Sequence, residues 1–180
     1  MGSQLVNGAF AIWMTGLPCA GKSTIARKLQ EHISNLAVLD GDDLREWLSP
    51  KDFSKEARNE HNRKVAHLAK LLIKHNIPVA VSLISPFIEN RDIARKIVGN
   101  DKFIETYVKC SLDICENRDI KGMYKKARKN EIKNFTGIQD PYEEPPCPEI
   151  TVNTERETPT ETVNKIISKL KDLGHLLENK

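Results

Sequence analysis

Short apolar runs alternate with longer amphipathic segments along the whole chain. The runs have the length and composition of buried strands, and they cover residues 9–14, 36–39, 78–84, 103–110 and 150–152. Between and after them, apolar side chains recur at helical spacing, which predicts helices over residues 22–33, 44–48, 54–75, 85–98, 112–118 and 158–177. Strands that alternate with helices predict a mostly parallel sheet with helices on both faces, a three-layer α/β fold.

A glycine-containing segment lies between the first predicted strand and the first predicted helix. It reads Gly16-Leu17-Pro18-Cys19-Ala20-Gly21-Lys22-Ser23-Thr24 and fits the phosphate-binding P-loop pattern. In this context backbone N–H groups curl around phosphate oxygens, and the helix N-terminus adds positive potential. We expect Lys22 to reach the β- and γ-phosphates and the Ser23 hydroxyl to ligate Mg²⁺. A dinucleotide site would need the pattern Gly-x-Gly-x-x-Gly, which this loop lacks. The fold prediction is therefore that of a P-loop nucleoside-triphosphate hydrolase.

Carboxylates follow the second predicted strand at the point where that strand ends. The residues are Asp40, Gly41, Asp42 and Asp43, and open α/β sheets place their ligands at the carboxyl ends of their strands. Side chains alternate along an extended segment, so Asp40 and Asp42 can point the same way. We expect one of them to support the metal and the other to orient or deprotonate an acceptor. For Asp43 we expect a role as the N-cap of the next helix.

The character of the chain changes between residues 121 and 134. A single acidic residue, Glu131, is outnumbered there by Lys121, Lys125, Lys126, Arg128, Lys129 and Lys133, and a proline-rich stretch follows over residues 140–148. A basic segment with few core residues, late in a P-loop chain, indicates a mobile lid over phosphates, at about residues 120–148. For the lysines alone, a solvated charged helix is the alternative.

Length and composition set the broad class. A chain of 180 residues predicts one domain, here residues 1–180. The net charge of +3 is too small to favour nucleic acid as a partner. No apolar segment approaches the roughly 20 residues of a membrane helix, and we find no secretion signal, so we expect no membrane association and a cytoplasmic location. The cysteines are scattered without metal spacing and are expected to be reduced thiols; Cys19 fills a position in the P-loop that needs a small side chain.

A P-loop serves GTPases, ATPase motors and small-molecule kinases alike. The chain has no Asn-Lys-x-Asp guanine motif and no second domain to move, so a short chain with a basic lid favours phosphoryl transfer from ATP to a small acceptor. Such a kinase needs a carboxylate near the acceptor hydroxyl, arginines for acceptor anions and a lid that excludes water.

The motifs in order resemble those of the adenylylsulfate kinase family. They extend over nearly the whole chain and comprise the P-loop, Asp40-Gly41-Asp42-x-x-Arg45, Phe53-Ser54-x-x-x-Arg58, Ile84-Ser85-Pro86-Phe87, residues 121–128 and Phe135-Thr136-Gly137-Ile138. The resemblance implies a transferase of sulfate activation, which passes the γ-phosphate of ATP, with Mg²⁺, to the 3'-hydroxyl of adenylylsulfate.

Residue roles follow from the resemblance position by position. It places Asp42 at the acceptor hydroxyl and Asp40 nearer the metal, and it makes Phe53 and Phe135 the two faces of a base sandwich, with core packing as the alternative for each ring. The acceptor side further comprises Arg45, Arg58, His61, Ile84, Ser85 and Lys133, and the ATP side comprises Arg118, Lys121 and Arg128. Ser85 matches a possible phosphoserine of the family, but Ser85-Pro86 also predicts a helix N-cap followed by proline at the first helical position. We favour direct in-line transfer, with Ser85 as an acceptor-site residue.

Two departures from the family pattern leave the acceptor open. Asp43 stands where asparagine is common, and His61 stands where the family has an acceptor-contacting asparagine. One alternative acceptor is another nucleotide with an anionic extension, such as cytidine diphosphoramidate. A further alternative is a nucleotide-binding module without turnover, although Lys22, Ser23, Asp40 and Asp42 are all present. Similar proteins form dimers, so a homodimer is also expected.

Overall fold

The centre of the molecule is a five-stranded parallel sheet, described in a computed structural model that covers residues 4–48 and 54–177. The strand order is β2-β3-β1-β4-β5, and all four strand pairs are parallel. The strands are β1 (Ala11–Thr15), β2 (Ala37–Asp40), β3 (Val79–Ser82), β4 (Phe103–Lys109) and β5 (Ile150–Asn153). This arrangement confirms the predicted α/β fold.

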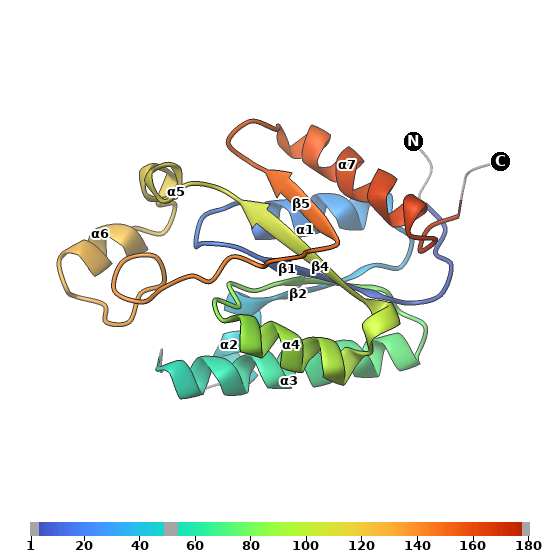
Figure 1. Ribbon diagram of the computed structural model, residues 1–180, viewed down its shortest axis with the longest axis horizontal. Helices are drawn as coiled ribbons and strands as arrows, with labels where there is room; N and C mark the ends of the chain where they lie inside the picture. Colours follow the sequence, from blue (N-terminus) through green and yellow to red (C-terminus); the bar gives the residue numbers. More distant parts are fainter. Residues whose placement is uncertain (1–3, 49–53, 178–180) are drawn as a thin grey trace.

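Helices cover both faces of the sheet, as Figure 1 shows, with α1 and α7 on one face and α3 and α4 on the other. The helices are α1 (Lys22–His32), α2 (Gly41–Leu48), α3 (Lys55–Lys74), α4 (Ile88–Val98), α5 (Leu112–Arg118), α6 (Met123–Arg128) and α7 (Pro159–Asp172), with a 3-10 turn η1 (Asn100–Lys102) before β4. No helix among the described residues is long and apolar enough to cross a membrane.

Strand β1 lies in the middle of the sheet and is buried on both sides. Side chains alternate along a strand, so Ile12 and Met14 join the cluster under α1 and α7, while Ala11 and Trp13 join the cluster under α3 and α4. A central parallel strand has no solvent face, which is why this part of the sequence is a continuous apolar run.

The start of α4 differs from its prediction. The helix begins at Ile88 after Phe87, and the predicted N-cap Ser85 lies before it, with a positive φ of 43°. The Ser85 hydroxyl accepts a hydrogen bond from Trp13 Nε1 at 3.1 Å instead. The first amide of α4, Ile88 N–H, donates to the Glu143 carboxylate at 2.7 Å. The N-cap prediction for Ser85 was therefore wrong, because the capping oxygen comes from a distant part of the chain.

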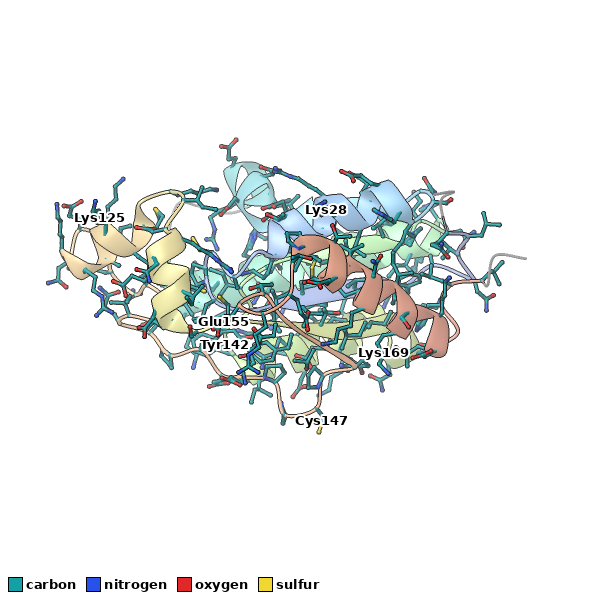
Figure 2. The ribbon with its side chains drawn as sticks, turned by 90° about the horizontal axis from the view of Figure 1, so that it is seen from above. Lys28, Lys125, Tyr142, Cys147, Glu155 and Lys169 are labelled. Atoms are coloured by element: carbon teal, nitrogen blue, oxygen red, sulfur yellow. The ribbon has the colours of Figure 1, made fainter. Side chains whose placement is uncertain are left out.

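The segment predicted as a lid begins beyond α5, runs through α6 and returns along the sheet to β5 (Figure 1). The basic side chains of α6 face solvent, and Figure 2 shows Lys125 extending from the outer end of the molecule. The segment is less poor in core than expected. Tyr124 is fully buried, and the Phe135 ring meets the Tyr124 ring edge-on, with the ring centroids 4.9 Å apart.

Candidate active site

The P-loop, residues 16–24, connects β1 to α1 through a tight turn. Gly16 lies against β4, where an added Cβ would come within 2.5 Å of the Val108 carbonyl oxygen. Gly21 caps α1 in the left-handed conformation, with φ 99°, and Cys19 also has a positive φ of 61°. The loop thus needs glycine for close approach at one end and for backbone conformation at the other.

Three carbonyl groups of the P-loop, those of Pro18, Cys19 and Ala20, accept hydrogen bonds from side chains of other elements. The Pro18 carbonyl accepts from Tyr124 Oη at 3.0 Å, and the Ala20 carbonyl accepts from Thr154 Oγ1 at 2.9 Å. Arg118, predicted on the ATP side, donates to the Thr154 carbonyl at 2.6 Å and to the Cys19 carbonyl at 3.4 Å. Because the amide and carbonyl groups of a peptide point in opposite directions, the amides of Cys19 and Gly21 point away from these partners and suit an anion, while the Ala20 amide donates to the Leu17 carbonyl at 3.2 Å.

Lys22 places its ammonium group inside this loop. The residue is 7% exposed, and its Nζ donates to the carbonyl oxygens of Gly16 at 2.9 Å and Leu17 at 2.7 Å. Burial lowers the pKa of Lys22 to about 8, against the raising effect of nearby acidic groups that include Asp42 and Asp40. A desolvated cation at this position is stabilised by a phosphate anion, so the loop fits the triphosphate of ATP.

Oxygen donors for a divalent cation meet beside Lys22. Ser23 Oγ lies 3.2 Å from Ser82 Oγ, and Ser82 pairs with Asp40 in the β2–β3 register. Among residues 4–48 and 54–177 no group of three His, Cys, Asp or Glu side chains could hold a metal. Mg²⁺ with a nucleotide uses one or two protein oxygens plus phosphates and water, so hydroxyl and carboxylate oxygens at this edge fit Mg²⁺.

The acidic turn after β2 is shaped by Asp40. Its Oδ1 accepts from the Asp42 backbone N–H at 3.0 Å, which caps α2, so the capping role expected of Asp43 belongs to Asp40. Asp42 itself is exposed and forms an ion pair with Lys121, with Nζ 2.6 Å from Oδ2. This contact joins the predicted lid to the carboxylate expected at the acceptor hydroxyl.

His61 on α3 stands directly behind this turn. It is 1% exposed, and its ring forms a hydrogen bond with the backbone of Gly41. Burial, together with the positive charges of Arg45 and Lys64, lowers the pKa of His61 to about 4, so the imidazole is neutral at pH 7. Arg45, on α2, is half-buried close to this ring.

Arg58 reaches from α3 to the turn formed by residues 134–140. Its guanidinium donates to Thr136 Oγ1 at 3.0 Å and to the Asn134 carbonyl, and NH1 lies 3.1 Å from Asp140 Oδ2. The residue is only 7% exposed, and this burial lowers the pKa of Arg58 although Asp140 opposes the effect. A residue predicted to hold acceptor anions is therefore paired with a carboxylate of the chain itself.

The remaining predicted site residues lie in different surroundings. Ile84 is half-buried, Ser85 is 2% exposed, and Phe135, at 9%, occupies the core position that we left open as its alternative. Arg128 makes a double contact with Glu116 of α5, at 2.9 and 2.8 Å, and Lys133 is exposed. Phe53 lies outside the described residues.

Sequence reasoning missed several polar groups of this site. Ser82 had a usable signal, because it is a polar residue at the carboxyl end of an apolar strand. Thr154 follows β5 in the same way. Tyr124 stands among lysines and gave no signal, since its contact with Pro18 joins residues far apart in the sequence.

Comparison with known proteins finds one family over this site. The sequence profile of the family described as adenylylsulphate kinase matches residues 8–153. The adenylyl-sulfate kinase of Thermodesulfovibrio yellowstonii is 48% identical over 169 residues, which cover 91% of this chain and 84% of that protein. That of Gloeothece citriformis is 49% identical over 170 residues, covering 92% of this chain and 96% of that protein.

Solved structures agree with the sequence comparison. The Mycobacterium tuberculosis APS kinase CysC, in complex with AMPPNP and APS, has a TM-score of 0.84 and 37% identity, over 94% of this chain and 99% of that chain. A gluconokinase from Sinorhizobium meliloti, 14% identical with a TM-score of 0.63, shares the fold alone. The matched profile covers most of the chain, including the P-loop, the acidic turn and the turn of residues 134–140, and this chain belongs to the adenylylsulfate kinase family.

Proposed function

We propose that this protein transfers the γ-phosphate of ATP to the 3'-hydroxyl of adenylylsulfate, giving 3'-phosphoadenylylsulfate and ADP. The observation that carries the proposal is the meeting of the P-loop with the acidic turn in a member of this family. Ser23 of α1 touches Ser82 of β3, and Ser82 stands beside Asp40 of β2. Phosphate-binding and acceptor-side groups therefore share one edge of the sheet.

On the donor side, Lys22 and the amides of the P-loop hold the β- and γ-phosphates. Ser23 and Asp40 would hold Mg²⁺, which when bound would neutralise charge on the phosphate oxygens. Arg118 links the loop to Thr154 and so shapes the nucleotide side.

On the acceptor side, Asp42 orients the attacking hydroxyl and takes its proton as the new oxygen–phosphorus bond forms and the bond from phosphorus to the β–γ bridging oxygen breaks. Asp42 is 70% exposed at its side chain, so an acceptor can approach it. Lys121, which is paired with Asp42 in this structure, exchanges this carboxylate for the phosphates of ATP when the acceptor binds.

The acceptor's anionic group is assigned to Arg45 and Arg58, whose guanidinium forks match oxyanions. An anion at Arg58 competes with Asp140, so binding there exchanges one partner of a buried cation for another. Phe135 stacks on the acceptor base only if the segment of residues 134–140 rearranges so that the ring leaves the core. The proposed acceptor site is completed by Phe53, His61, Ile84 and Lys133.

We assign Ser85 to the structural support of the acceptor site and not to a phosphoserine intermediate. It is 2% exposed, and its hydroxyl accepts from Trp13, which places the oxygen in the core. Direct in-line transfer needs no phosphoserine. We further propose a single kinase domain over residues 1–180 with a lid over about residues 120–148. We also propose a homodimer, and light scattering, which measures the mass of the particle in solution, tests it.

The experiment is an Mg-ATP kinase assay that follows ADP release with adenylylsulfate and cytidine diphosphoramidate side by side, and with no acceptor. We expect fast release with adenylylsulfate alone. Preference for the cytidine compound would keep the phosphoryl-transfer chemistry but replace the proposed acceptor. Nucleotide binding without ADP release in any arm would favour the non-catalytic module.

A further inference from the structure

The hydroxyl of Thr15, at the end of β1 directly before the P-loop, is a meeting point of three segments. Thr15 is fully buried, and its hydroxyl donates to the Ile84 carbonyl at 2.8 Å. The Tyr142 hydroxyl lies 2.9 Å from Thr15 Oγ1. A threonine hydroxyl has one proton, which is given to Ile84, so Tyr142 is the donor in the second bond. The Ile84 carbonyl also receives the Gly16 N–H at 3.4 Å.

Arg91 of α4 makes a second connection between the same two segments. Its NH1 donates to the Ser85 carbonyl at 2.7 Å and its NH2 to the Glu143 carbonyl at 2.8 Å. The Nε donates to Glu105 Oε1 at 2.7 Å, which fixes the plane of a guanidinium that is only 2% exposed. Residues 142 and 143 are thus joined to residues 84 and 85 through one hydroxyl and one guanidinium.

Glu143 extends the contact toward α4. Its backbone N–H donates to the Pro86 carbonyl at 2.8 Å, and its carboxylate accepts the Ile88 N–H at 2.7 Å. The return segment (residues 140–149), which leads from the predicted lid to β5, therefore lies along the β3–α4 loop (residues 83–87) and binds it at successive residues.

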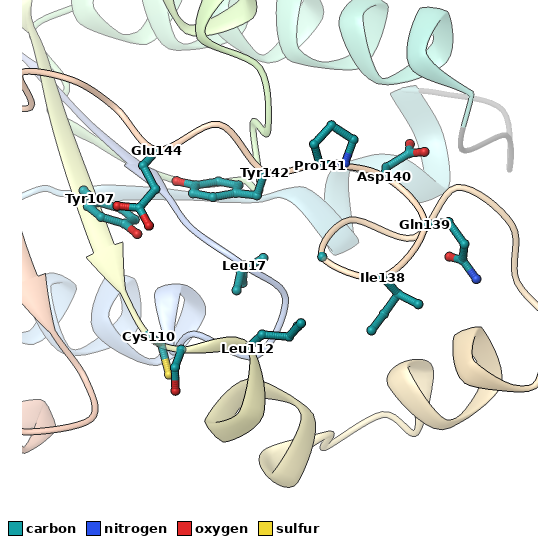
Figure 3. A pocket seen from close by; sticks show the side chains of 12 residues that line it. Leu17, Tyr107, Cys110, Leu112, Ile138, Gln139, Asp140, Pro141, Tyr142 and Glu144 are labelled. Atoms are coloured by element: carbon teal, nitrogen blue, oxygen red, sulfur yellow. The ribbon is translucent and has the colours of Figure 1, made fainter.

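The β3–α4 loop needs this support. Ser85 has φ 43°, a left-handed conformation that a residue with a side chain keeps only where its surroundings hold it. The return segment has less support on its other side. A cavity of about 590 Å³ opens there, and Figure 3 shows Tyr107 toward one end of it, Ile138 toward the other, and Tyr142 and Leu17 between them. The Thr15 hydroxyl holds residue 142, and the Arg91 guanidinium and the two hydrogen bonds of Glu143 hold residue 143.

We propose that Thr15, Arg91 and Tyr142 are positioning residues that couple the lid to the acceptor site, by fixing the β3–α4 loop to the return segment and to the start of the P-loop. The inference rests on the proposed function, which places Ile84 and Ser85 at the acceptor. When the lid moves, residues 142 and 143 move with it and shift the β3–α4 loop that contacts the acceptor. Conversely, an acceptor that orders the β3–α4 loop favours the lid arrangement in which these hydrogen bonds form.

The test replaces Tyr142 by Phe, which removes one hydroxyl and keeps the ring. The matched control is Tyr107→Phe, in the ring stacked on Tyr142 at 6.1 Å, whose hydroxyl has Glu144 as its partner. For Tyr142→Phe we expect the KM for adenylylsulfate to rise about three- to tenfold, the worth of one net hydrogen bond, with the KM for ATP unchanged. Tyr107→Phe leaves both KM values unchanged.

A double-mutant cycle with Thr15 sharpens the test. Thr15→Val keeps the shape of the side chain and removes the hydroxyl, whereas Thr15→Ser keeps the hydroxyl and removes the methyl group. We expect Thr15→Val with Tyr142→Phe to be no worse than Thr15→Val alone, and Thr15→Ser to retain the wild-type acceptor KM. A lower melting temperature with both KM values unchanged would show a merely structural role and overturn the coupling.

Hydrogen–deuterium exchange separates this inference from the proposed function. In Tyr142→Phe we expect faster exchange at the amides of residues 83–88 as well as 140–148, whatever acceptor the enzyme uses. If adenylylsulfate is not phosphorylated but both segments exchange faster, the function is wrong and the connection is real. Faster exchange confined to residues 140–148 would overturn the connection.

Discussion

Replacing Asp42 by Ala separates chemistry from folding in this protein. The side chain is exposed and forms an ion pair with Lys121, whose side chain is 64% exposed. An exposed pair contributes about 0.2–1 kcal/mol, and an acidic residue in the first turn of a helix adds about 0.3–1 kcal/mol through the helix dipole. The free energy of unfolding should therefore fall by less than about 2 kcal/mol.

The expected loss of activity is much larger. A positioned general base contributes about 10²- to 10⁴-fold, which corresponds to about 3–5 kcal/mol on the barrier. The matched control is Asp43→Ala, which removes an exposed carboxylate from the same helical turn and changes the helix dipole equally. Its turnover should stay within about threefold of the wild type.

The assay measures ADP release at saturating ATP and acceptor, nucleotide affinity by calorimetry, and thermal unfolding, for both variants. We expect Asp42→Ala to bind ATP with nearly wild-type affinity and to melt close to Asp43→Ala, while its kcat falls at least 100-fold, the lower end of that range. Unchanged turnover would remove Asp42 from the mechanism. An equal loss of kcat in both variants would show that the negative charge of this turn matters, and that Asp42 does not itself accept the proton.

Lys22, Gly41 and Arg58 each give further predictions. Because phosphate raises the lowered pKa of Lys22 from about 8, ATP binding at pH 8.5 should take up protons, and calorimetry in two buffers of different ionisation enthalpy measures this; equal enthalpies in both would contradict it. Between pH 8 and 10.5 the unfolded chain binds more protons at Lys22 than the folded protein, so stability relative to Lys22→Met should rise with pH in that window. Gly41→Ala should lower the unfolding free energy by about 1–3 kcal/mol and also reduce turnover, because its Cβ would lie 2.4 Å from Leu83 Cδ2 and 3.1 Å from the Ser82 carbonyl; denaturant unfolding that matches the wild type would refute this close approach. Arg58→Lys should raise the acceptor KM and lower the melting temperature, since one ammonium cannot replace the guanidinium contacts to the 134–140 turn; a variant with both values unchanged would argue against either role.

The fold could be predicted because its signals are local. β1 is buried on both faces and therefore reads as a continuous apolar run, and the P-loop pattern stands between a strand and a helix. The predicted helix 158–177 shows the limit of such signals, since α7 ends at Asp172, two residues before Gly174 with φ 78°. The prediction continued past this end because Leu173 and Leu177 keep the helical spacing, although the structure leaves both of them exposed.

The site was harder to predict because its contacts join distant segments. Ser85-Pro86 has the composition of a helix start, yet Glu143 supplies the cap and the Ser85 hydroxyl binds Trp13. Nothing near Arg58 in the sequence indicates that Asp140 will pair with it. Polar groups of this kind are placed by tertiary structure, and sequence spacing carries no information about them.

The central claim is tested most directly by identifying the product. The protein is incubated with Mg-ATP and adenylylsulfate, or with an adenylylsulfate analogue that lacks the 3'-hydroxyl, and the products are examined by mass spectrometry and phosphorus NMR. The account predicts one added phosphate, located on the 3'-oxygen, with adenylylsulfate and no transfer to the 3'-deoxy analogue. Phosphate transfer to the analogue, or a phosphate at any other oxygen, would contradict the account.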